Sequence, residues 1–476
     1  MKCNIINILV SILPKSIKIK LVINMRFYDR KDDTHFLSKI TRTSHKQMIS
    51  IYGRRRIGKT TLLKHVLPGA EYFFVDTRSS STLLLDFSKR LIQGQFDNWE
   101  EFFRYLLSHK KIVIFDEFQN FSKVDKSIFS VLQKVWDELE SDTKLILCGS
   151  YVGMMKHIFL DSKEPLFGRA SYNIKVKPFN FKSSYEMLSN FGYTFEESIA
   201  WYSILGGVPK YLWYLEDKKA FNEKIYDLFY SPFAPLKEEG KNILVMEFGS
   251  EHPGYFSILK AIGNYDRKLS EIANKSALKD TTVSKYLYEL VNYYDVVEKV
   301  ENKFSGKKRD TRYRIKDNYL RFWYRFIYGI MDVVEFNPQA ALKYAIENIS
   351  QHIDLTFEHI IMESLDDLYK YGLIPCMPVS IGKNWGKMRD GSTYEIDVIG
   401  ECEKKILLVE CKWTSKEITQ RNIDEFLEKS TYLKDKRTKI PIIISKAPFK
   451  SSTSDNVIKI TLKDLETVFS GQTHRI

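Results

Sequence analysis

Residues 47–60 read QMISIYGRRRIGKT and decide the fold of the first part of this 476-residue chain. The segment begins as an apolar, β-prone run and ends in the pattern G-x-x-x-x-G-K-[ST], and the residues after it are compatible with a helix. Gly53 and Gly58 let the backbone N–H groups of such a loop face phosphates. Lys59 suits the β- and γ-phosphates, and Thr60 offers a hydroxyl to Mg²⁺. The pattern predicts a nucleoside triphosphate site, and the flanking strand and helix argue against a basic surface turn.

Strand-like and helix-like runs alternate over the first two-fifths of the chain. The apolar runs predict strands at about 47–52, 71–76, 111–116, 144–149 and 172–176. Strands that alternate with helices run parallel and are joined by helical crossovers. We therefore expect a doubly wound α/β domain on a parallel sheet.

Two carboxylates follow the apolar run KIVIF at 111–115. Asp116 at the strand end suits Mg²⁺, and Glu117 suits a general base that orients the attacking water. An acidic pair after a strand is common in surface loops. Here a further strand separates the pair from the phosphate loop, which is typical of the additional-strand, catalytic-glutamate class of P-loop ATPases. We predict hydrolysis of ATP with Mg²⁺ as cofactor.

Two further polar residues are candidates with open alternatives. Ser150 follows the strand KLILCG and could sense the γ-phosphate or cap the next helix. Arg169 could be an arginine finger or a sensor of the nucleotide state, in its own or a neighbouring subunit. It could equally be an ordinary surface arginine.

The bulk composition sets outer limits. A chain of 476 residues exceeds one core, so about three or four domains are expected. The net charge of +13 favours an acidic partner such as nucleic acid, although many basic proteins bind none.

Five scattered cysteines without a CxxC pair argue against a disulfide framework and a zinc site, and favour a reducing cytoplasm. No apolar run reaches the ~18 residues of a membrane helix. Residues 1–24 are expected to be an extension or tail, with Met25 as the true start.

The segment 251–330 has the pattern of a winged helix-turn-helix. Three helical runs, YFSILKAIG, KLSEIANKS and TTVSKYLYELVNYYDVV, precede the hairpin-like stretch KVENKFSGKKRDTRYRIK at 299–316. That stretch has eight basic and two acidic residues, which suits contacts with DNA phosphates. Adaptors that bind proteins share the pattern, so this alternative stays open. The predicted DNA-contacting residues are Thr281, Thr282, Ser284, Lys285, Lys307, Lys308 and Arg309.

A third candidate site lies near the C-terminus, where the patterns predict a helix, three strands, a helix and a strand. The runs YEIDVIG (394–400) and ILLVECKW (406–413) form a predicted hairpin. Alternation places Glu410 and Lys412 on one face, and a turn centred between the runs would set Asp397 opposite Glu410. Two carboxylates can hold a divalent cation, and a lysine can orient water. The alternative is a hairpin with a surface salt bridge.

Motifs across residues 25–330 resemble the archaeal-type ATPase family, a branch of the signal-transduction ATPases related to AAA⁺ proteins. They are FYDR (27–30), YGRRRIGKTTLL (52–63), FDEFQ (115–119), CGS (148–150), PLFGR (165–169) and GGVPKYL (206–212). The resemblance implies that Gln119 and Arg169 belong to the nucleotide machinery. With the phosphate loop, it predicts the nucleotide-contacting set Gly53, Arg54, Arg55, Arg56, Ile57, Gly58, Lys59, Thr60, Thr61 and Ser150.

The C-terminal pattern D-x₁₂-E-x-K resembles the PD-(D/E)xK nuclease superfamily, and more closely the nuclease-like domain that ends many archaeal-type ATPases. Asp397 and Glu410 would be the metal ligands, and Trp385 and Trp413 would flank the site. Ile396 stands where the superfamily often has proline, at a position that varies. Inactive members exist, so DNA cleavage stays open. The resemblance implies catalytic roles for Glu358, Asp397, Glu410 and Lys412.

The expected division is a P-loop ATPase domain at 25–180, a helical lid at 181–250, a winged helix at 251–330 and a nuclease-like αβββαβ domain at 345–476. It predicts a cytoplasmic, Mg²⁺-dependent ATPase that couples ATP hydrolysis to DNA binding or processing. One alternative is a nucleotide-dependent regulatory switch with an inactive nuclease-like domain, and another is a binding module without turnover. The expected partners are ATP, DNA and further copies of the chain in a nucleotide-dependent oligomer, with no membrane.

Overall fold

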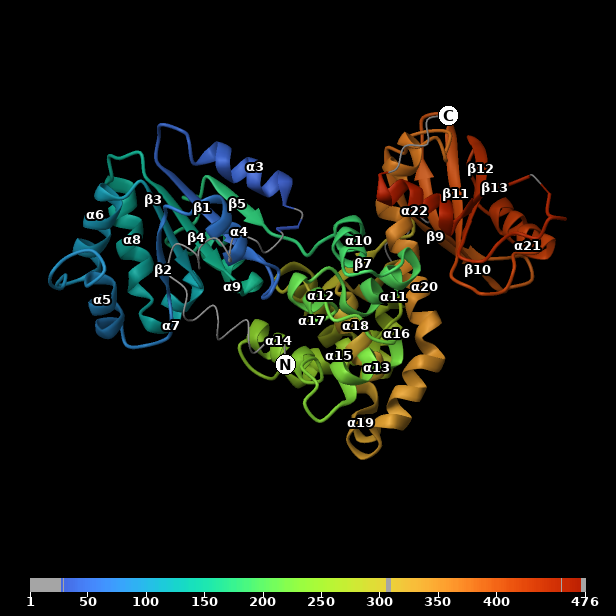
Figure 1. Ribbon diagram of the computed structural model, residues 1–476, viewed down its shortest axis with the longest axis horizontal. Helices are drawn as coiled ribbons and strands as arrows, with labels where there is room; N and C mark the ends of the chain where they lie inside the picture. The colour runs from blue at the N-terminus through green and yellow to red at the C-terminus, as the bar shows by residue number, and fades with distance from the viewer. Residues whose placement is uncertain (1–26, 29, 305–309, 455, 472–476) are drawn as a thin grey trace.

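The chain folds into three regions in the computed structural model, which describes residues 27–28, 30–304, 310–454 and 456–471 (Figure 1). A parallel sheet with its helices comes first, a helical region lies in the middle, and a second sheet comes last. The expected extension at 1–24 and three predicted DNA-contacting residues, Lys307, Lys308 and Arg309, lie outside the described residues. Among the residues that are described, no helix is both long and apolar enough to cross a membrane.

Five parallel strands form the first sheet, in the order β2-β3-β4-β1-β5. They are β1 (Gln47–Tyr52), β2 (Glu71–Phe74), β3 (Ile112–Asp116), β4 (Lys144–Gly149) and β5 (Tyr172–Lys175). The five predicted strands and their parallel direction are confirmed. β1 and β4 are buried at every position, as expected for apolar strands that are covered on both faces. The strand between β1 and β3 in the sheet is β4, whereas β2, which follows β1 in the chain, takes the edge.

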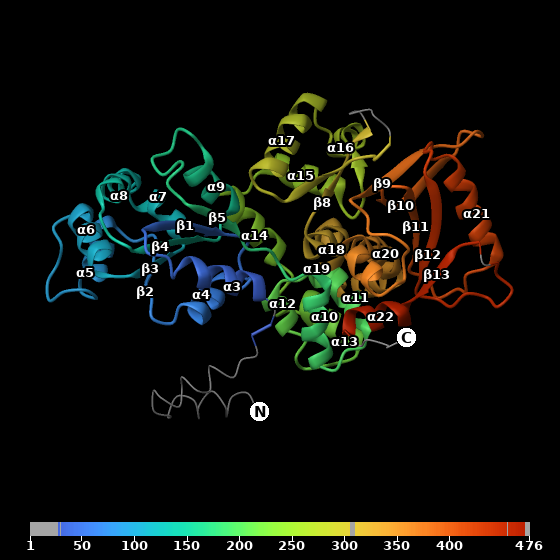
Figure 2. The same ribbon diagram turned by 90° about the horizontal axis from the view of Figure 1, so that it is seen from above.

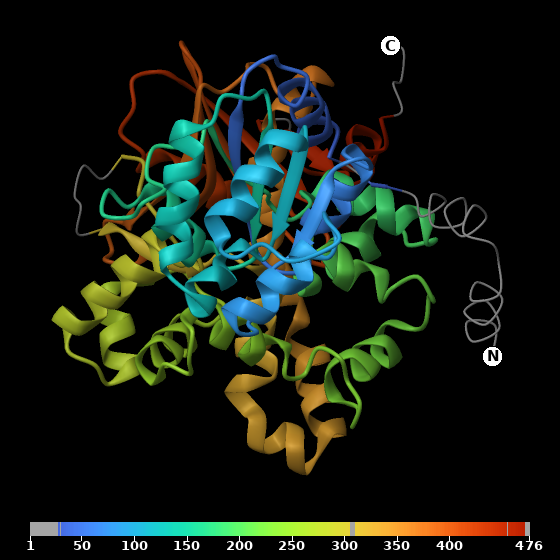
Figure 3. The same cartoon turned by 90° about the vertical axis from the view of Figure 1, so that its left-hand side faces the viewer.

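Helices cover both faces of this sheet, which confirms the doubly wound α/β fold (Figures 1 and 3). On one face, Leu37 and Leu62 pack against Ile49 of β1 and Ile114 of β3. The other face carries an aromatic core that includes Phe73 of β2. The helices of this region are α3 (Lys31–Ile40), α4 (Lys59–Val66), α5 (Ser80–Ser88), α6 (Trp99–His109), α7 (Phe121–Val124), α8 (Ser127–Glu138) and α9 (Val152–Leu160).

The middle region has two parts, which keep the names of the predicted helical lid and winged helix. The lid helices are α10 (Phe181–Asn190), α11 (Phe195–Leu205), α12 (Pro209–Trp213), α13 (Phe221–Ile225) and α14 (Glu239–Phe248). The winged helix comprises α15 (Pro253–Ile262), β6 (Arg267–Lys268), α16 (Leu269–Ser276), α17 (Asp280–Asn292), β7 (Val297–Val300) and β8 (Arg312–Ile315). Its strands form an antiparallel sheet in the order β6-β8-β7, and the β7–β8 hairpin is the wing. Leu244 of the lid and Leu259 and Leu287 of the winged helix belong to one hydrophobic core, so the two parts pack as one body.

A long helix joins the middle region to the second sheet. After α18 (Asn318–Phe326) and α19 (Met331–Phe336), α20 (Pro338–Lys370) runs for 33 residues and is drawn in orange in Figure 1. Ala341 and Ala345 in its first turns lie in the core of the middle region. Phe357 and Leu368, further along, lie in the core beneath the second sheet. One helix therefore belongs to two cores.

The second sheet is mixed, in the order β13-β12-β11-β10-β9. Its elements are β9 (Ser380–Lys387), β10 (Thr393–Glu401), β11 (Lys405–Lys412), α21 (Gln420–Thr431), β12 (Thr438–Ser445), β13 (Ile458–Thr461) and α22 (Leu462–Ser470). β9, β10 and β11 are antiparallel neighbours, and β11, β12 and β13 run parallel. With α20, the first six elements have the predicted αβββαβ order, and β13 and α22 extend it.

One expectation about the cysteines is wrong. Cys376, before β9, and Cys402, in the turn between β10 and β11, form a disulfide. The two lie 26 residues apart without a recognisable spacing, and antiparallel pairing of β9 with β10 brings their segments together. Cys148 and Cys411 are free and buried.

Candidate functional site

The phosphate loop lies at the carboxyl end of β1, where the chain turns into α4. A side chain at Gly53 would place its Cβ 2.3 Å from the carbonyl oxygen of Val176, so only glycine fits there. The buried ammonium of Lys59 donates to the carbonyl oxygens of Gly53 (2.7 Å) and Arg54 (3.1 Å). Burial lowers the pKa of Lys59. A phosphate bound inside the loop would be a charged partner for the Lys59 ammonium and would replace the carbonyl oxygens of Gly53 and Arg54.

The Mg²⁺ candidates contact each other. The hydroxyl of Thr60, in the first turn of α4, donates at 2.6 Å to Oδ2 of Asp116, at the carboxyl end of β3. The phenol of Tyr72 donates to the same oxygen at 2.7 Å, and burial together with this bond raises the pKa of Tyr72. A hydroxyl and a carboxylate at this spacing are the protein ligands that Mg²⁺ takes beside a nucleotide. The two residues present therefore fit the cation.

Ser150 links the lysine to the predicted general base. Its Oγ accepts from Lys59 Nζ at 3.0 Å and donates to Oε1 of Glu117 at 2.8 Å. Gln119 donates to Oε2 of Glu117 at 2.6 Å. A Cβ at Gly149 would lie 2.3 Å from Sδ of Met155 and 2.5 Å from Oε1 of Gln119, so a larger residue before Ser150 would require both side chains to shift. The structure therefore joins Lys59, Ser150, Glu117 and Gln119 in one hydrogen-bonded chain.

The arginines of the phosphate loop turn away from the phosphate position. Arg54 pairs with Asp317, which caps α18, and Arg56 pairs with Glu239 at the start of α14. Arg55 donates to Sδ of Met246 at 3.1 Å. Ile57 is fully buried in the core, and Thr61 is exposed on α4. The arginine side chains thus connect the loop to the middle region, and only backbone of this stretch faces the phosphate position.

Arg169 lies near the amino ends of the strands, whereas the nucleotide site is built at their carboxyl ends. It precedes β5, and Ser171 N donates to the carbonyl of Met48 near the start of β1, whereas the phosphate loop follows the end of β1. The Arg169 guanidinium pairs with Asp137 at 3.0 Å. Within one chain, Arg169 is therefore not brought to the nucleotide site.

The candidate recognition helix α17 presents its predicted residues to solvent. Thr281, Ser284 and Lys285 are exposed, and Thr282 is partly exposed. Tyr288, on the same helix, is 61% exposed. The surface expected to face DNA is uncovered.

The wing packs against the edge strand β9. Lys303 N donates to the carbonyl of Lys383 at 2.9 Å. Arg312 pairs with Glu395 at 2.8 Å, and its guanidinium lies 4.0 Å from the ring centre of Trp385. Basic side chains at both ends of the wing are therefore neutralised by the second sheet, which the sequence did not predict.

The predicted C-terminal residues meet where β10 and β11 pair. Val398 stands opposite Val409 in the last pair between the two strands, and the same register extended by one residue would set Asp397 opposite Glu410. Oδ2 of Asp397 accepts from Cys411 N at 2.8 Å. Lys412 and Lys429 both donate to Oε1 of Glu410, at 2.7 and 2.9 Å. Oε2 of Glu410 is buried and accepts no hydrogen bond from the part of the chain that the structure describes. Burial, and then the charges of Glu358 and Glu410, raise the pKa of Asp397. A divalent cation that displaces the lysines would satisfy the unpaired Oε2 of Glu410 and offset the negative charges beside Asp397, so the two carboxylates fit one.

Glu358 has a partner that the sequence did not reveal. Its carboxylate pairs with Lys383 of β9, whose side chain is 2% exposed. Lys383 also lies 3.5 Å from Glu395 and 3.9 Å from Asp266 of the winged helix. Burial raises the pKa of Glu358, while Lys383 opposes that change. The ammonium group of Lys383 therefore already neutralises Glu358, one of the four residues predicted to be catalytic at the C-terminal site.

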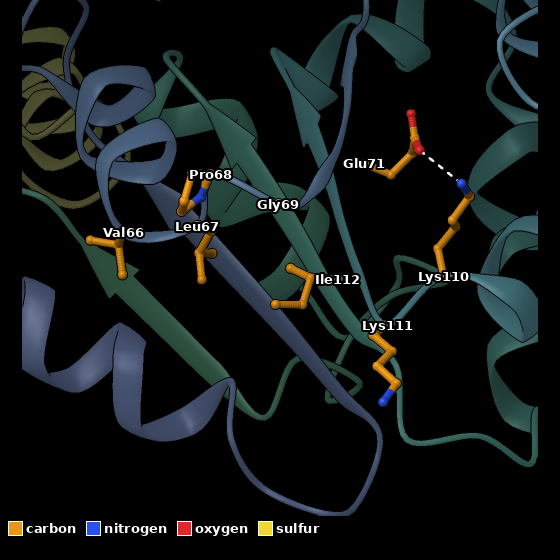
Figure 4. A pocket seen from close by; sticks show the side chains of 8 residues that line it. All are labelled: Val66, Leu67, Pro68, Gly69, Glu71, Lys110, Lys111 and Ile112. Atoms are coloured by element: carbon orange, nitrogen blue, oxygen red, sulfur yellow. Dashed lines mark ion pairs between the residues drawn. The ribbon is translucent and has the colours of Figure 1, made fainter. Parts of the chain in front are cut away.

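No cluster of three or more His, Cys, Asp or Glu side chains with metal-binding geometry occurs within the described ranges. The two-carboxylate arrangements above fall below that size. A cavity of about 330 Å³ opens beside the starts of β2 and β3, at the edge away from the phosphate loop (Figure 4). Its polar lining includes the Lys110–Glu71 ion pair at 3.1 Å. It holds none of the predicted site residues.

Comparisons with known proteins match two separate parts of the chain. Residues 45–185 match the AAA domain family, and residues 323–424 match a family described as archaeal and bacterial proteins of unknown function. An uncharacterized protein of Methanocaldococcus jannaschii is 29% identical over 428 residues, which cover 86% of this chain and 92% of that protein. Among solved structures, the Walker-type ATPase of Pyrococcus abyssi aligns with 63% of this chain and 97% of its own (TM-score 0.48, 20% identity). The ORC2 protein of Aeropyrum pernix aligns with 68% and 98% (TM-score 0.45, 15% identity).

The domain match covers the phosphate loop, the acidic end of β3 and Ser150, which are the groups that the structure joins by hydrogen bonds. The first region of the chain is an ATP-hydrolysing P-loop enzyme whose residues 45–185 match the AAA domain family.

Proposed function

We propose that this ATPase couples ATP hydrolysis to the binding and processing of DNA by its winged helix and its C-terminal carboxylate site. The observation that carries the proposal is the buried Oε2 of Glu410, which has no hydrogen-bond partner among the described residues. The other oxygen of Glu410 accepts from Lys412, and Asp397 is bound to the backbone N–H of the adjacent Cys411. An acceptor left unpaired in a protein interior is costly unless a ligand satisfies it.

At the nucleotide site, Lys59 would bind the β- and γ-phosphates, and Thr60 and Asp116 would hold Mg²⁺. Bound Mg²⁺ supplies positive charge at the phosphate oxygens. Glu117 would orient the attacking water, and Ser150 would report the γ-phosphate, since its hydroxyl contacts both Lys59 and Glu117.

The loop arginines support transmission of the nucleotide state. Phosphate binding would draw the Lys59 ammonium away from the carbonyl oxygens of Gly53 and Arg54. The backbone of the loop from 53 to 59 would then have to adjust. Arg54 and Arg56 connect that backbone to Asp317 and Glu239. A change in the loop would therefore reach the middle region as a change in two ion pairs.

DNA would approach the exposed face of α17, where Thr281, Ser284 and Lys285 are accessible. At the C-terminal site, Asp397 and Glu410 would hold a divalent cation, and Lys412 would orient water towards a phosphodiester. Such a cation supplies Lewis-acid catalysis when it is bound.

ATPase and Mg²⁺-dependent nuclease assays on one preparation test the proposal, with wild type and Lys412→Ala and with several DNA substrates. We expect ATP turnover in both proteins and DNA cleavage in wild type alone. No cleavage by wild type on any substrate would remove the nuclease from the proposal.

A second candidate function is a nucleotide-dependent regulatory switch with an inactive nuclease-like domain, in the cytoplasm. The pairing of Glu358 with Lys383 and the packing of the wing on β9 favour it, because both occupy groups that a nuclease would use. ATP-dependent oligomerisation, with Arg169 reaching a neighbouring copy, belongs to the same candidate. Light scattering of Glu117→Gln with and without ATP would test this.

A further inference from the structure

A carboxylate from outside the ATPase region occupies the start of α9, directly after Ser150. Glu247 of α14 accepts from Gly153 N at 2.7 Å through Oε1 and from Val152 N at 3.2 Å through Oε2. The first N–H groups of a helix lack partners within the helix and carry partial positive charge, so a carboxylate stabilises them. Tyr151, the N-cap residue of α9, makes no side-chain cap hydrogen bond.

The contact is close and specific. A Cβ at Gly153 would lie 3.4 Å from Oε1 of Glu247 and 3.3 Å from the ring of Tyr294, which is tighter than most such contacts. Two residues earlier in the chain from α9, Ser150 donates to Glu117 and accepts from Lys59. The position of the first turn of α9 therefore sets the position of the Ser150 hydroxyl.

α14 approaches the nucleotide site at both of its ends. Glu239 pairs with Arg56 at its start, and Met246 accepts from Arg55 near its end. Residues 246 and 247 follow residue 239 by about two helical turns, so all three lie on the same side of α14. Figure 2 shows α14 beside α9 and β5, and the chain continues from α14 into α15 of the winged helix. Glu247 thus belongs to the body that would move with the winged helix, while its partners belong to the ATPase.

We infer that Glu247 is a positioning residue for ATP hydrolysis, which holds Ser150 against Lys59 and Glu117 by fixing the first turn of α9. It touches neither the nucleotide position nor the water position. Its effect passes through the backbone of 150–153.

Kinetics of Glu247→Ala and Glu247→Gln test this inference. We expect kcat for ATP to fall roughly tenfold in Glu247→Ala, which corresponds to about 1.4 kcal/mol in the barrier. The KM for ATP should stay within about twofold, because Lys59 and the loop backbone are unchanged. Glu247→Gln keeps one acceptor for Gly153 N and should lose about threefold in kcat. Glu251→Gln is the matched control, because Glu251 follows α14 and is 56% exposed beside Lys241.

A kcat in Glu247→Ala equal to that of wild type would overturn the inference. A rise in KM with unchanged kcat would do the same, since it would assign Glu247 to nucleotide binding. If Glu247→Ala does not fold, as heat unfolding would show, Glu247→Gln decides by the same criteria.

A pH series supplies a readout that a purely structural role would not move. Burial raises the pKa of Glu247 from 4.5 to about 7. Its charged and titratable surroundings are Arg54, Lys59, Tyr151, Lys156, Tyr294 and Asp295. The two backbone N–H groups favour the ionised carboxylate, but burial favours the protonated acid and outweighs them. Glu247 should therefore be held in this position most firmly below pH 4.5, less firmly as the pH rises to about 7, and at a constant level above. Hydrogen exchange of the amides at 151–153, corrected for intrinsic rates, should show this loss of protection between pH 5 and 7 in wild type only. The same slope in Glu247→Gln would contradict the assignment.

Discussion

The nucleotide site and the C-terminal site are both built at strand ends, yet they satisfy their polar groups in different ways. At the nucleotide site, Lys59, Ser150 and Glu117 bond to one another in a chain. At the C-terminal site, lysines from other elements hold the carboxylates: Lys383 of β9 and Lys429 of α21. The first site offers a lysine to the phosphates and carboxylates to Mg²⁺, as a nucleotide with its cation requires. At the second site, lysine side chains already occupy the places beside the carboxylates. A site of the second kind needs a competing cation or a rearrangement before it can act.

The largest expected effect falls on the nucleotide site. Glu117→Gln should lower ATP turnover roughly a thousandfold, within the range for loss of a general base. ATP binding should persist, because Lys59 and Thr60 keep their contacts. Phosphate release and a fluorescent nucleotide titration measure the two quantities. Turnover near the wild-type rate would show that Glu117 is not the base and that the two sites differ less than proposed.

The next effect concerns the cations of the C-terminal site. Lys383→Met should lower the free energy of unfolding by about 3 kcal/mol, because it leaves buried Glu358 without its cation, while Asp266 keeps Arg314. Lys412→Met is the matched control and should cost less than about 1 kcal/mol, since Lys412 is partly exposed and Glu410 keeps Lys429. Urea denaturation measures both. Equal losses would mean that Lys383 is no more important than a surface lysine.

A smaller effect separates the two halves of the winged helix. Lys285→Ala on α17 should weaken DNA binding by about 1 kcal/mol, or roughly fivefold, and reduce the salt slope by about 0.9. Lys303→Ala on the wing should leave the slope unchanged, because Lys303 already pairs with Glu401 at 3.3 Å. Fluorescence anisotropy over a range of salt concentrations distinguishes them. The reverse order would show that the wing leaves β9 when DNA binds.

The smallest effect tests Arg169. Arg169→Ala should change turnover by less than about twofold in a monomer, because Arg169 pairs with Asp137 at the far edge of the sheet. The assay is repeated over a range of protein concentrations. A loss of turnover that appears only at high concentration would assign Arg169 to a neighbouring copy.

Much of the first site could be predicted because its parts follow parallel strands. Carboxyl ends of parallel strands meet at one edge, so the residues after 47–52, 111–116 and 144–149 had to converge. The same rule explains the place of Arg169. It precedes β5 and therefore lies near the amino ends of the strands, away from the nucleotide site. The hairpin register likewise followed from the spacing of Asp397 and Glu410.

The partners of these residues could not be predicted. Tyr72, Lys383 and Glu247 lie within ordinary strand or helix patterns, and their roles depend on side-chain direction and on packing between distant segments. The Cys376–Cys402 disulfide depends in the same way on strand pairing. Polar groups that interact across regions leave no periodic signal in a single sequence.

The long helix α20 has a mechanical consequence. A helix of 33 residues is about 50 Å long, and both of its ends are anchored in hydrophobic cores. It therefore works as a lever arm with no flexible joint along its length. A tilt of about 5° at the end held by the core of the middle region would displace the other end by roughly 4 Å, which exceeds the reach of a hydrogen bond. Small rotations that begin at the phosphate loop would thus arrive beneath the second sheet as movements large enough to make or break contacts such as Glu358–Lys383.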